Sequence, residues 1–197
     1  MNRLIFLFLM CSLISSCGNR KIGTAGELKA YIANDENGLH KMELKNDLTI
    51  EAFYRPTELV WARDLADIHD VQERAKQKQV YDSLSYFMLH FSRKGKELEN
   101  AYVSDPTKFK AVVDYLSFNI SNDLFILHDA DTLHALDAVY TRTFGISEGT
   151  AVMVVFKENV SRYSGSLKLC FDDAEFGTGL TEFSFNTRDI KNIPTLN

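Results

Sequence analysis

The chain alternates apolar and polar positions with a period of two in several segments, and this pattern predicts β-strands. It is clear at residues 39–45 and 48–55, where an Asn-Asp pair typical of a tight turn separates the two segments. We therefore predict a β-hairpin there. Residues 85–92, "SYFMLHFS", alternate in the same way and predict a further strand.

Three other segments have the periodicity of amphipathic helices. Residues 25–33 follow a Thr-x-x-Glu capping box. Residues 57–80 follow a proline and carry an apolar stripe, although their tail, "QERAKQKQ", is almost wholly polar. Residues 106–118 follow an aspartate that can cap a helix, and they begin with a proline that suits its first turn. We therefore predict about three helices.

From about residue 123 onward the pattern predicts successive strands joined by short polar connections. The expected strands are 123–128, 134–144, 150–157, 166–172 and 181–186. A parallel crossover needs about a dozen residues, so these short links imply antiparallel neighbours. We expect the C-terminal half to form a β-meander and the whole fold to be α+β, with a mostly antiparallel sheet.

The composition agrees with a folded domain and argues against one class of partner. A chain of 197 residues with 45% apolar and 25% charged residues has ordinary globular values and suffices for one domain. The formal net charge is -5. Since no basic surface is indicated, we expect no nucleic-acid partner.

A separate apolar run opens the chain. Arg3 precedes an apolar stretch from Leu4 to about Ile14, and small residues follow it, which is the layout of a secretory signal. The run is too short for a hydrocarbon core, which needs about 20 residues. We therefore expect a cleaved signal and not a spanning helix.

The four residues Ile14-Ser15-Ser16-Cys17 resemble the lipobox of bacterial lipoproteins: a branched apolar residue, two small residues and a cysteine. In that family the signal is cut just before the cysteine, whose thiol carries diacylglycerol and whose new amino group is often acylated. The resemblance implies a covalent lipid on Cys17. Two or more acyl chains make membrane attachment stable where one chain does not.

The resemblance also implies an organisation and a location. Residues 1–16 would be the signal peptide, 17–23 a short lipidated tether and 24–197 a single α+β domain. Gly18 stands where an aspartate would favour retention in the inner membrane, so the implied location is the outer membrane of a Gram-negative cell envelope. The stretches "NDLTIEAFYRPTELVWARDL" and "DIKNIPTL" have the general look of envelope lipoproteins without an assigned function, and they carry over no functional residue.

One histidine–aspartate cluster could bind a metal. The stretch "LHDADTLH" holds His128, Asp129, Asp131 and His134, whose imidazoles and carboxylates suit zinc or another divalent ion. The other interpretation is a hairpin turn in which the aspartates cap the local backbone. We favour the turn.

The acidic loop "FDDAEFGTG" offers Asp172, Asp173 and Glu175 as hard oxygen ligands that suit calcium. Its spacing is not that of an EF-hand, and a solvated loop is the simpler interpretation. We predict no cofactor other than the lipid on Cys17.

Two possible nucleophiles have weak support. Ser147 meets the bare Gly-x-Ser-x-Gly pattern, but strands on both sides indicate a hairpin loop and not a nucleophile elbow. Cys170 has no evident basic neighbour, and we expect it to serve packing.

These observations favour a membrane-anchored binding or assembly subunit without catalytic activity. It would dock an envelope protein through an exposed strand edge or the apolar face of the 57–80 helix. The alternative is a periplasmic metal-dependent hydrolase or metal-binding protein that uses the histidine–aspartate cluster. Capture of a small molecule or lipid in an aromatic-lined cavity is a third hypothesis.

Overall fold

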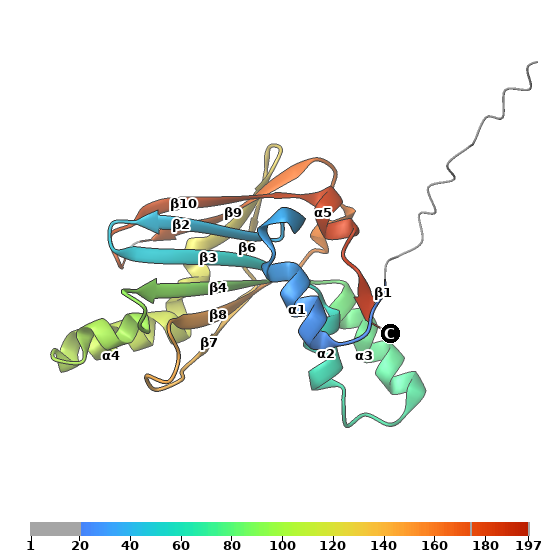
Figure 1. Cartoon of the computed structure of the whole chain (residues 1–197), viewed down its shortest axis with the longest axis horizontal. Coiled ribbons are helices and arrows are strands. Elements are labelled where there is room, and N and C mark those ends of the chain that lie inside the picture. The colour runs from blue at the N-terminus through green and yellow to red at the C-terminus, as the bar shows by residue number, and fades with distance from the viewer. Residues whose placement is uncertain (1–20, 174, 197) are drawn as a thin grey trace, which may run out of the picture.

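The computed structural model describes residues 21–173 and 175–196 (Figure 1). The expected signal peptide and the lipobox with Cys17 lie outside the described residues. Within them, two mainly antiparallel sheets pack against each other, α1, α2, α3 and α5 gather at one end, and α4 lies at the other (Figure 1). The α+β class with mostly antiparallel sheets is confirmed. In this part of the chain no helix is long and apolar enough to cross a membrane.

The larger sheet has five strands in the order β2-β3-β4-β8-β7. Their bounds are β2 His40–Lys45, β3 Leu48–Arg55, β4 Ser85–Arg93, β7 Asp137–Thr141 and β8 Thr150–Phe156. The second sheet has four strands in the order β10-β9-β5-β6. Their bounds are β5 Leu124–His128, β6 Asp131–His134, β9 Ser166–Asp173 and β10 Gly179–Asn186. The predicted hairpin is confirmed as β2–β3, and Asn46 in its turn has a φ of 57°.

The predicted strand at 134–144 is wrong because the chain changes sheets within it. The Ala135 amide donates to the Leu124 carbonyl at 2.9 Å, and the next amide, of Leu136, donates to the Val155 carbonyl at 2.8 Å. The chain thus leaves the four-stranded sheet and joins the five-stranded one. This corner closes one side of the sandwich, and on the other side β2 and β10 lie in contact.

The C-terminal half is rich in strands, as expected, but the hairpins are divided between two sheets. The hairpins β5–β6 and β9–β10 belong to the four-stranded sheet, whereas β7–β8 belongs to the five-stranded one. Accordingly β8 pairs with β4 and β9 pairs with β5. These long-range pairings turn the expected meander into two facing layers.

Aromatic side chains fill the space between the layers. The largest fully buried residues are phenylalanines from both sheets: Phe87, Phe91, Phe156, Phe171, Phe183 and Phe185. Phe87 packs edge-to-face on Phe156 at 5.8 Å and on Phe185 at 5.3 Å between ring centroids, which joins one sheet to the other. The rings that could have lined an internal cavity therefore form the core.

The helices follow their predicted caps, with one exception. Helix α1 covers Ala25–Ala33, and its Thr24–Glu27 capping box is confirmed. Helix α4 covers Pro106–Asp114, is capped by Asp105 and continues as a π-helical turn. The remaining short helices are α5 Thr187–Lys191, the π turn Tyr115–Asn119 and the 3₁₀ turns Asp35–Asn37, Leu98–Tyr102, Ile120–Asp123 and Val160–Arg162.

The exception is the predicted helix 57–80, which is two helices: α2 (Glu58–Asp64) and α3 (Val71–Asp82). The break occurs because the Asp70 side chain accepts the Glu73 amide at 2.8 Å and starts a new helix. Leu59 and Val60 of α2 are buried, and no residue of α3 is. The apolar face expected to dock a partner is thus partly packed inside the domain, through Leu59, Val60 and Leu65, whereas Trp61 and Ile68 are half-buried.

The described chain enters the fold at its first residues. Strand β1 (Lys21–Ile22) pairs in parallel with β11 (Thr195–Leu196). Only four residue steps separate Cys17 from Lys21. A fully extended chain over that span reaches at most about 14 Å. A lipid on Cys17 would therefore hold this end of the domain at the membrane surface.

The bridging role of Phe87 predicts a large loss of stability when its ring is removed. We expect Phe87→Ala to lower the free energy of unfolding by about 3–5 kcal/mol, because it removes buried apolar area and leaves a cavity. Urea unfolding checks this value. The control Met42→Ala, at a side chain that is 62% exposed, should change stability by less than about 0.5 kcal/mol. Equal effects of the two variants would contradict the packing.

Candidate functional site

The predicted histidine–aspartate cluster is the β5–β6 hairpin, and its geometry separates the two histidines. His128 pairs with Asp131, and three positions away Phe125 pairs with His134. Alternate positions of a strand point to opposite faces. His128 and His134 therefore lie on opposite faces of the sheet. Among residues 21–173 and 175–196, no three His, Cys, Asp or Glu side chains are placed to hold a metal ion together.

Three members of this cluster, His128, Asp129 and His134, are placed by local structure. The His128 ring stacks on Tyr163 at 4.3 Å, and its Nε2 lies 2.9 Å from the Ser164 carbonyl. Asp129 occupies the turn with a φ of 53°. The His134 ring lies 6.0 Å from that of Phe125. The hairpin turn is present as predicted. Nε2 of His128 lies 3.8 Å from the Asp129 carboxylate, but His134 on the opposite face does not join them.

His128 and Asp131 do share a hollow of about 280 Å³ with Glu158 and Tyr163. The Tyr163 hydroxyl donates to Glu158 at 2.6 Å. Burial, this hydrogen bond and the charges of Glu158 and Asp131 raise the pKa of Tyr163 to about 12. The phenol therefore stays protonated near neutral pH and is a donor, not a base.

The acidic loop uses its central carboxylate to hold its own backbone. Asp173 accepts from the Glu175, Phe176 and Thr178 amides at 2.8, 2.7 and 2.6 Å, and from the Thr178 hydroxyl at 2.7 Å. Asp172 precedes it in β9 and so points to the other face of the sheet. The three candidate calcium ligands Asp172, Asp173 and Glu175 are therefore not gathered around one point.

The two possible nucleophiles are also placed as structural residues. Ser147 lies in the hairpin connection between β7 and β8, as predicted, where its Oγ accepts the Gly149 amide at 3.4 Å. Cys170 is fully buried in β9. Burial raises the pKa of its thiol to about 11, so the reactive thiolate is scarce at neutral pH.

Two buried carboxylates, Glu97 and Glu99, were not predicted from the sequence. Glu97 holds the backbone of the connection between β7 and β8. Glu97 is only 1% exposed. It accepts from the Thr143 hydroxyl, from the Gly145 amide at 2.8 Å and from the Ser147 amide at 3.2 Å. Burial alone would raise the pKa of Glu97, but these hydrogen bonds and the charge of Arg142 lower it. We call residues 142–149 the tip loop.

The second buried carboxylate, Glu99, connects the 3₁₀ turn Leu98–Tyr102 to β7 and β8 of the five-stranded sheet. It is also 1% exposed and accepts from the Tyr140 hydroxyl and from the Thr150 hydroxyl, the latter at 2.6 Å. Thr150 in turn accepts the Leu98 amide at 2.8 Å. The strands on both sides of the tip loop are thus fixed at its base.

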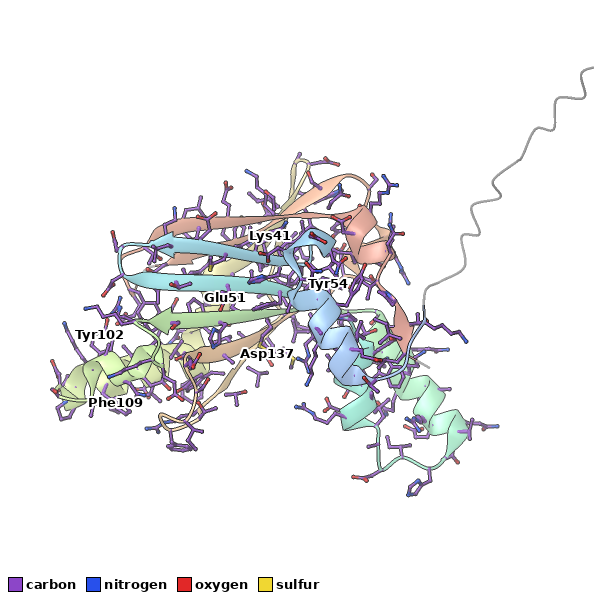
Figure 2. All side chains as sticks on the ribbon, in the orientation of Figure 1. Lys41, Glu51, Tyr54, Tyr102, Phe109 and Asp137 are labelled. Carbon is purple, nitrogen blue, oxygen red and sulfur yellow. The ribbon has the colours of Figure 1, made fainter. Side chains whose placement is uncertain are left out.

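The tip loop presents large apolar side chains to solvent. Phe144 is 75% exposed and Ile146 is 89% exposed. Phe144 has a φ of 55°, a strained conformation for a bulky residue that persists only where the surroundings impose it. The Arg142 guanidinium stacks on the rings of Phe144 and Phe109, at 4.6 and 5.2 Å from their centroids. Phe109 lies on α4, at the end of the domain away from β1 (Figure 2).

The outer face of the five-stranded sheet carries a second uncovered apolar region. The strand register places Phe53, Met88, Met153 and Val139 side by side across four strands. Beside this row, the Glu51 carboxylate lies 3.2 Å from Nε2 of His40 and 3.0 Å from Nδ1 of His90 (Figure 2). The face therefore combines an apolar row with a hydrogen-bonded polar row.

Comparisons with protein-family models, curated proteins and solved structures give no match to this chain.

The Glu97 contacts predict that the tip loop depends on an ionised carboxylate. We expect Glu97→Gln to lower the free energy of unfolding by about 1–3 kcal/mol and to speed hydrogen exchange at the Gly145 or the Ser147 amide. Glutamine keeps one acceptor oxygen, and its amide nitrogen cannot accept the hydrogen bond that the other carboxylate oxygen accepts. Nuclear magnetic resonance exchange and urea unfolding measure these effects. The exposed neighbour Glu148 supplies the control Glu148→Gln, which should change neither.

The same contacts predict a pH dependence. Because the folded-state pKa of Glu97 is lowered, its stabilisation is complete above the ordinary glutamate pKa and is lost as the pH falls through the lowered value. The stability difference between wild type and Glu97→Gln should therefore shrink on acidification. A difference that stays constant with pH would contradict the role of the charge.

Proposed function

We propose that this chain is a lipid-anchored envelope protein that acts as a non-catalytic binding or assembly subunit and docks a protein partner through the tip loop. The lipobox resemblance supports the anchor. The observation that carries the docking is the pair of exposed apolar side chains, Phe144 and Ile146, on a loop held by a buried carboxylate.

The exposure of Phe144 and Ile146 adds nothing to the stability of the isolated domain. Exposed apolar side chains add no stability in water, and the positive φ of Phe144 adds strain. A partner that covers both side chains would recover the apolar burial, and a loop that is already ordered loses little entropy on binding. The tip loop therefore has the properties of a preorganised contact.

The chemistry around the tip indicates what would fit it. Arg142 flanks the exposed Phe144 ring and is itself exposed. The matching surface is an apolar pocket with carboxylates at its rim, because aromatic and arginine side chains together form strong interface anchors. We therefore assign the occupant as a protein with an acidic-rimmed apolar pocket.

The position of the tip agrees with an anchored subunit. The chain enters at β1, whereas the β7–β8 connection lies at the other end of the domain, beside α4 (Figure 1). With a lipid on Cys17, the tip loop would point away from the membrane that holds the anchor. A partner in the adjoining compartment could then reach it.

The tip loop differs from the docking routes expected from sequence, which were an exposed strand edge and the apolar face of residues 57–80. Leu59 and Val60 on that face are buried, and the edge strands β2 and β10 lie in contact. The hydrolase alternative relied on four side chains, and the β5–β6 hairpin places His134 on the face opposite His128. We therefore advance no second function.

The anchor predicts that one cysteine controls membrane attachment. We expect Cys17→Ala to abolish incorporation of labelled palmitate and to release the protein from the membrane fraction, because no acyl chain is then attached. Metabolic labelling and fractionation measure both. Cys11→Ala, inside the expected signal, is the matched control and should keep label and attachment. Retained label in Cys17→Ala would exclude the anchor.

The docking proposal predicts selective loss of a partner. We expect the double variant Phe144→Ser/Ile146→Ser to weaken capture from detergent-solubilised envelope by about thirtyfold, the effect of an interface hot spot of about 2 kcal/mol. Quantitative mass spectrometry measures the loss for each captured protein. Leu180→Ser, at another exposed apolar residue on β10, should capture the same proteins as wild type.

Two results would count against docking of a different protein. One is an unchanged capture profile for the double variant. The other is concentration-dependent self-association of the wild type that the double variant lacks, measured by sedimentation, because the occupant would then be a second copy of this chain.

A further inference from the structure

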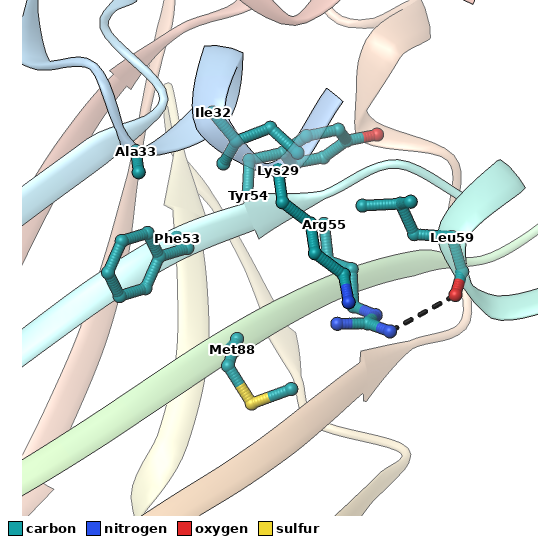
Figure 3. A pocket seen from close by; sticks show the side chains of 8 residues that line it. All are labelled: Lys29, Ile32, Ala33, Phe53, Tyr54, Arg55, Leu59 and Met88. Carbon is teal, nitrogen blue, oxygen red and sulfur yellow. Dashed lines mark hydrogen bonds between the residues drawn. The ribbon is translucent and has the colours of Figure 1, made fainter. Parts of the chain in front are cut away.

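A small groove opens between α1 and α2 on the outer face of the five-stranded sheet (Figure 3). Its volume is about 200 Å³. The walls are mainly apolar and come from Ile32 and Ala33 of α1, Phe53 of β3, Met88 of β4 and Leu59 of α2. The groove lies at one end of the apolar row that crosses this face.

Two cationic side chains stand at the groove. Lys29 reaches it from α1 and Arg55 from the end of β3, and both extend in the same direction in Figure 3. Among the described residues, neither has a carboxylate within 4.0 Å, the distance that defines the ion pairs elsewhere in the domain. An apolar hollow is thus bordered by two positive charges that form no ion pair within 4.0 Å among the described residues.

Arg55 has unused donors at this place. One Nη donates to the Leu59 carbonyl at 3.0 Å. Its Nε is buried and has no hydrogen-bond partner among the residues that the structure describes. Because Nε is closed to solvent, an anion in the groove would bind the terminal Nη atoms of the guanidinium.

The local electrostatics also favour an anion. Burial and the charge of Arg63 lower the pKa of Arg55, against the opposing charge of Asp64. A lowered pKa means that the surroundings disfavour the positive charge. An anionic group in the groove would reverse that effect.

We propose that this groove binds a single-tailed anionic amphiphile, with its carboxylate or phosphate head between Lys29 and Arg55 and its aliphatic tail against Phe53, Leu59 and Met88. The groove is smaller than the roughly 300–1,000 Å³ of sites that enclose a drug-sized ligand. It therefore holds the part of the tail nearest the head. The rest of the tail continues over Met153 and Val139, which extend the same row.

This proposal is independent of partner docking. The groove is formed by α1, which begins four residues after Lys21, whereas the tip loop lies at the opposite end of the domain. Loss of one activity should leave the other intact.

The test uses the full chain in phosphatidylcholine nanodiscs and water-soluble eight-carbon probes. Octanoate and octyl phosphate carry the two anionic heads, and octanol and octyltrimethylammonium are the neutral and cationic controls. Calorimetry with empty nanodiscs as the blank gives affinities. Trp61 is the single tryptophan of the chain and lies in α2 near Leu59, so its fluorescence is a second readout.

We expect at least one anionic probe to bind more than about tenfold more tightly than octanol, since a hydrogen bond to a charged group contributes about 1.5–3 kcal/mol. Binding of octanoate alone would identify a fatty acid head, and binding of octyl phosphate alone a lipid phosphate. Equal affinities for anionic, neutral and cationic probes, or no binding in the millimolar range, would overturn the proposal.

Variants of the groove separate charge from shape. Lys29→Gln and Arg55→Gln should each weaken anion binding by about tenfold and leave octanol unaffected. Ala33→Phe, at an exposed position of α1, should fill the groove and abolish binding without loss of folding. Lys76→Gln on α3 removes one exposed charge elsewhere and should bind as wild type. Unchanged binding in Ala33→Phe and Lys29→Gln would exclude the groove.

Discussion

The packing of Phe87 between the two sheets is the contact on which the rest of the arrangement depends. Its ring meets Phe156 within its own sheet and Phe185 of the opposite sheet. Because side chains alternate along a strand, one face of each sheet packs into the core and every second residue points outward. The interior is filled by rings, so binding features can occur only on outer faces and connections. The groove and the tip loop are two such places, and both carry apolar side chains.

Local signals predicted the elements whose causes are local. The capping box at Thr24 starts α1, and Asp105 followed by Pro106 starts α4. Alternation located the strands, but it does not tell which of the two faces of a strand points to the core. In β2 the apolar Met42 and Leu44 point outward, opposite Glu51 and Thr49 of β3.

The inward residues of β2 include Lys41, whose ammonium lies 6.0 Å from the centroid of the Phe185 ring. The polar face of β2 points inward because β2 lies beside β10. That position depends on the tertiary fold and cannot be read from the sequence of β2. The corner at Ala135 and Leu136 also depends on the tertiary fold, because these neighbouring residues hydrogen-bond to strands of two different sheets. Pattern alone could not have located it.

The candidate sites show the same division. His128 and His134 are close in sequence, and the period of the strand separates them. Glu97 and Glu99 lie in "KGKELEN", which has the composition of a surface turn, and their partners follow 41 to 51 residues later. No signal near these glutamates announces burial. Carboxylates whose hydrogen-bond partners are distant in sequence, such as Glu97 and Glu99, could therefore not be predicted. Polar residues that are close in sequence, such as those of the β5–β6 turn, were considered as a metal site although they do not form one.

The two binding features and the entry of the chain define an axis. The four-residue span before Lys21 would be too short to let a lipid-anchored domain turn over freely, because β1 is fixed to β11. An anchor on Cys17 would then orient the domain as well as locate it. The groove is built on α1, directly after this entry, and is the feature that lipid could reach. The tip loop lies at the far end and needs a partner that comes from the other side. A subunit of this shape could bind an amphiphile at one end and a protein at the other, because the aromatic core fills the space between the two and leaves each feature to its own surface.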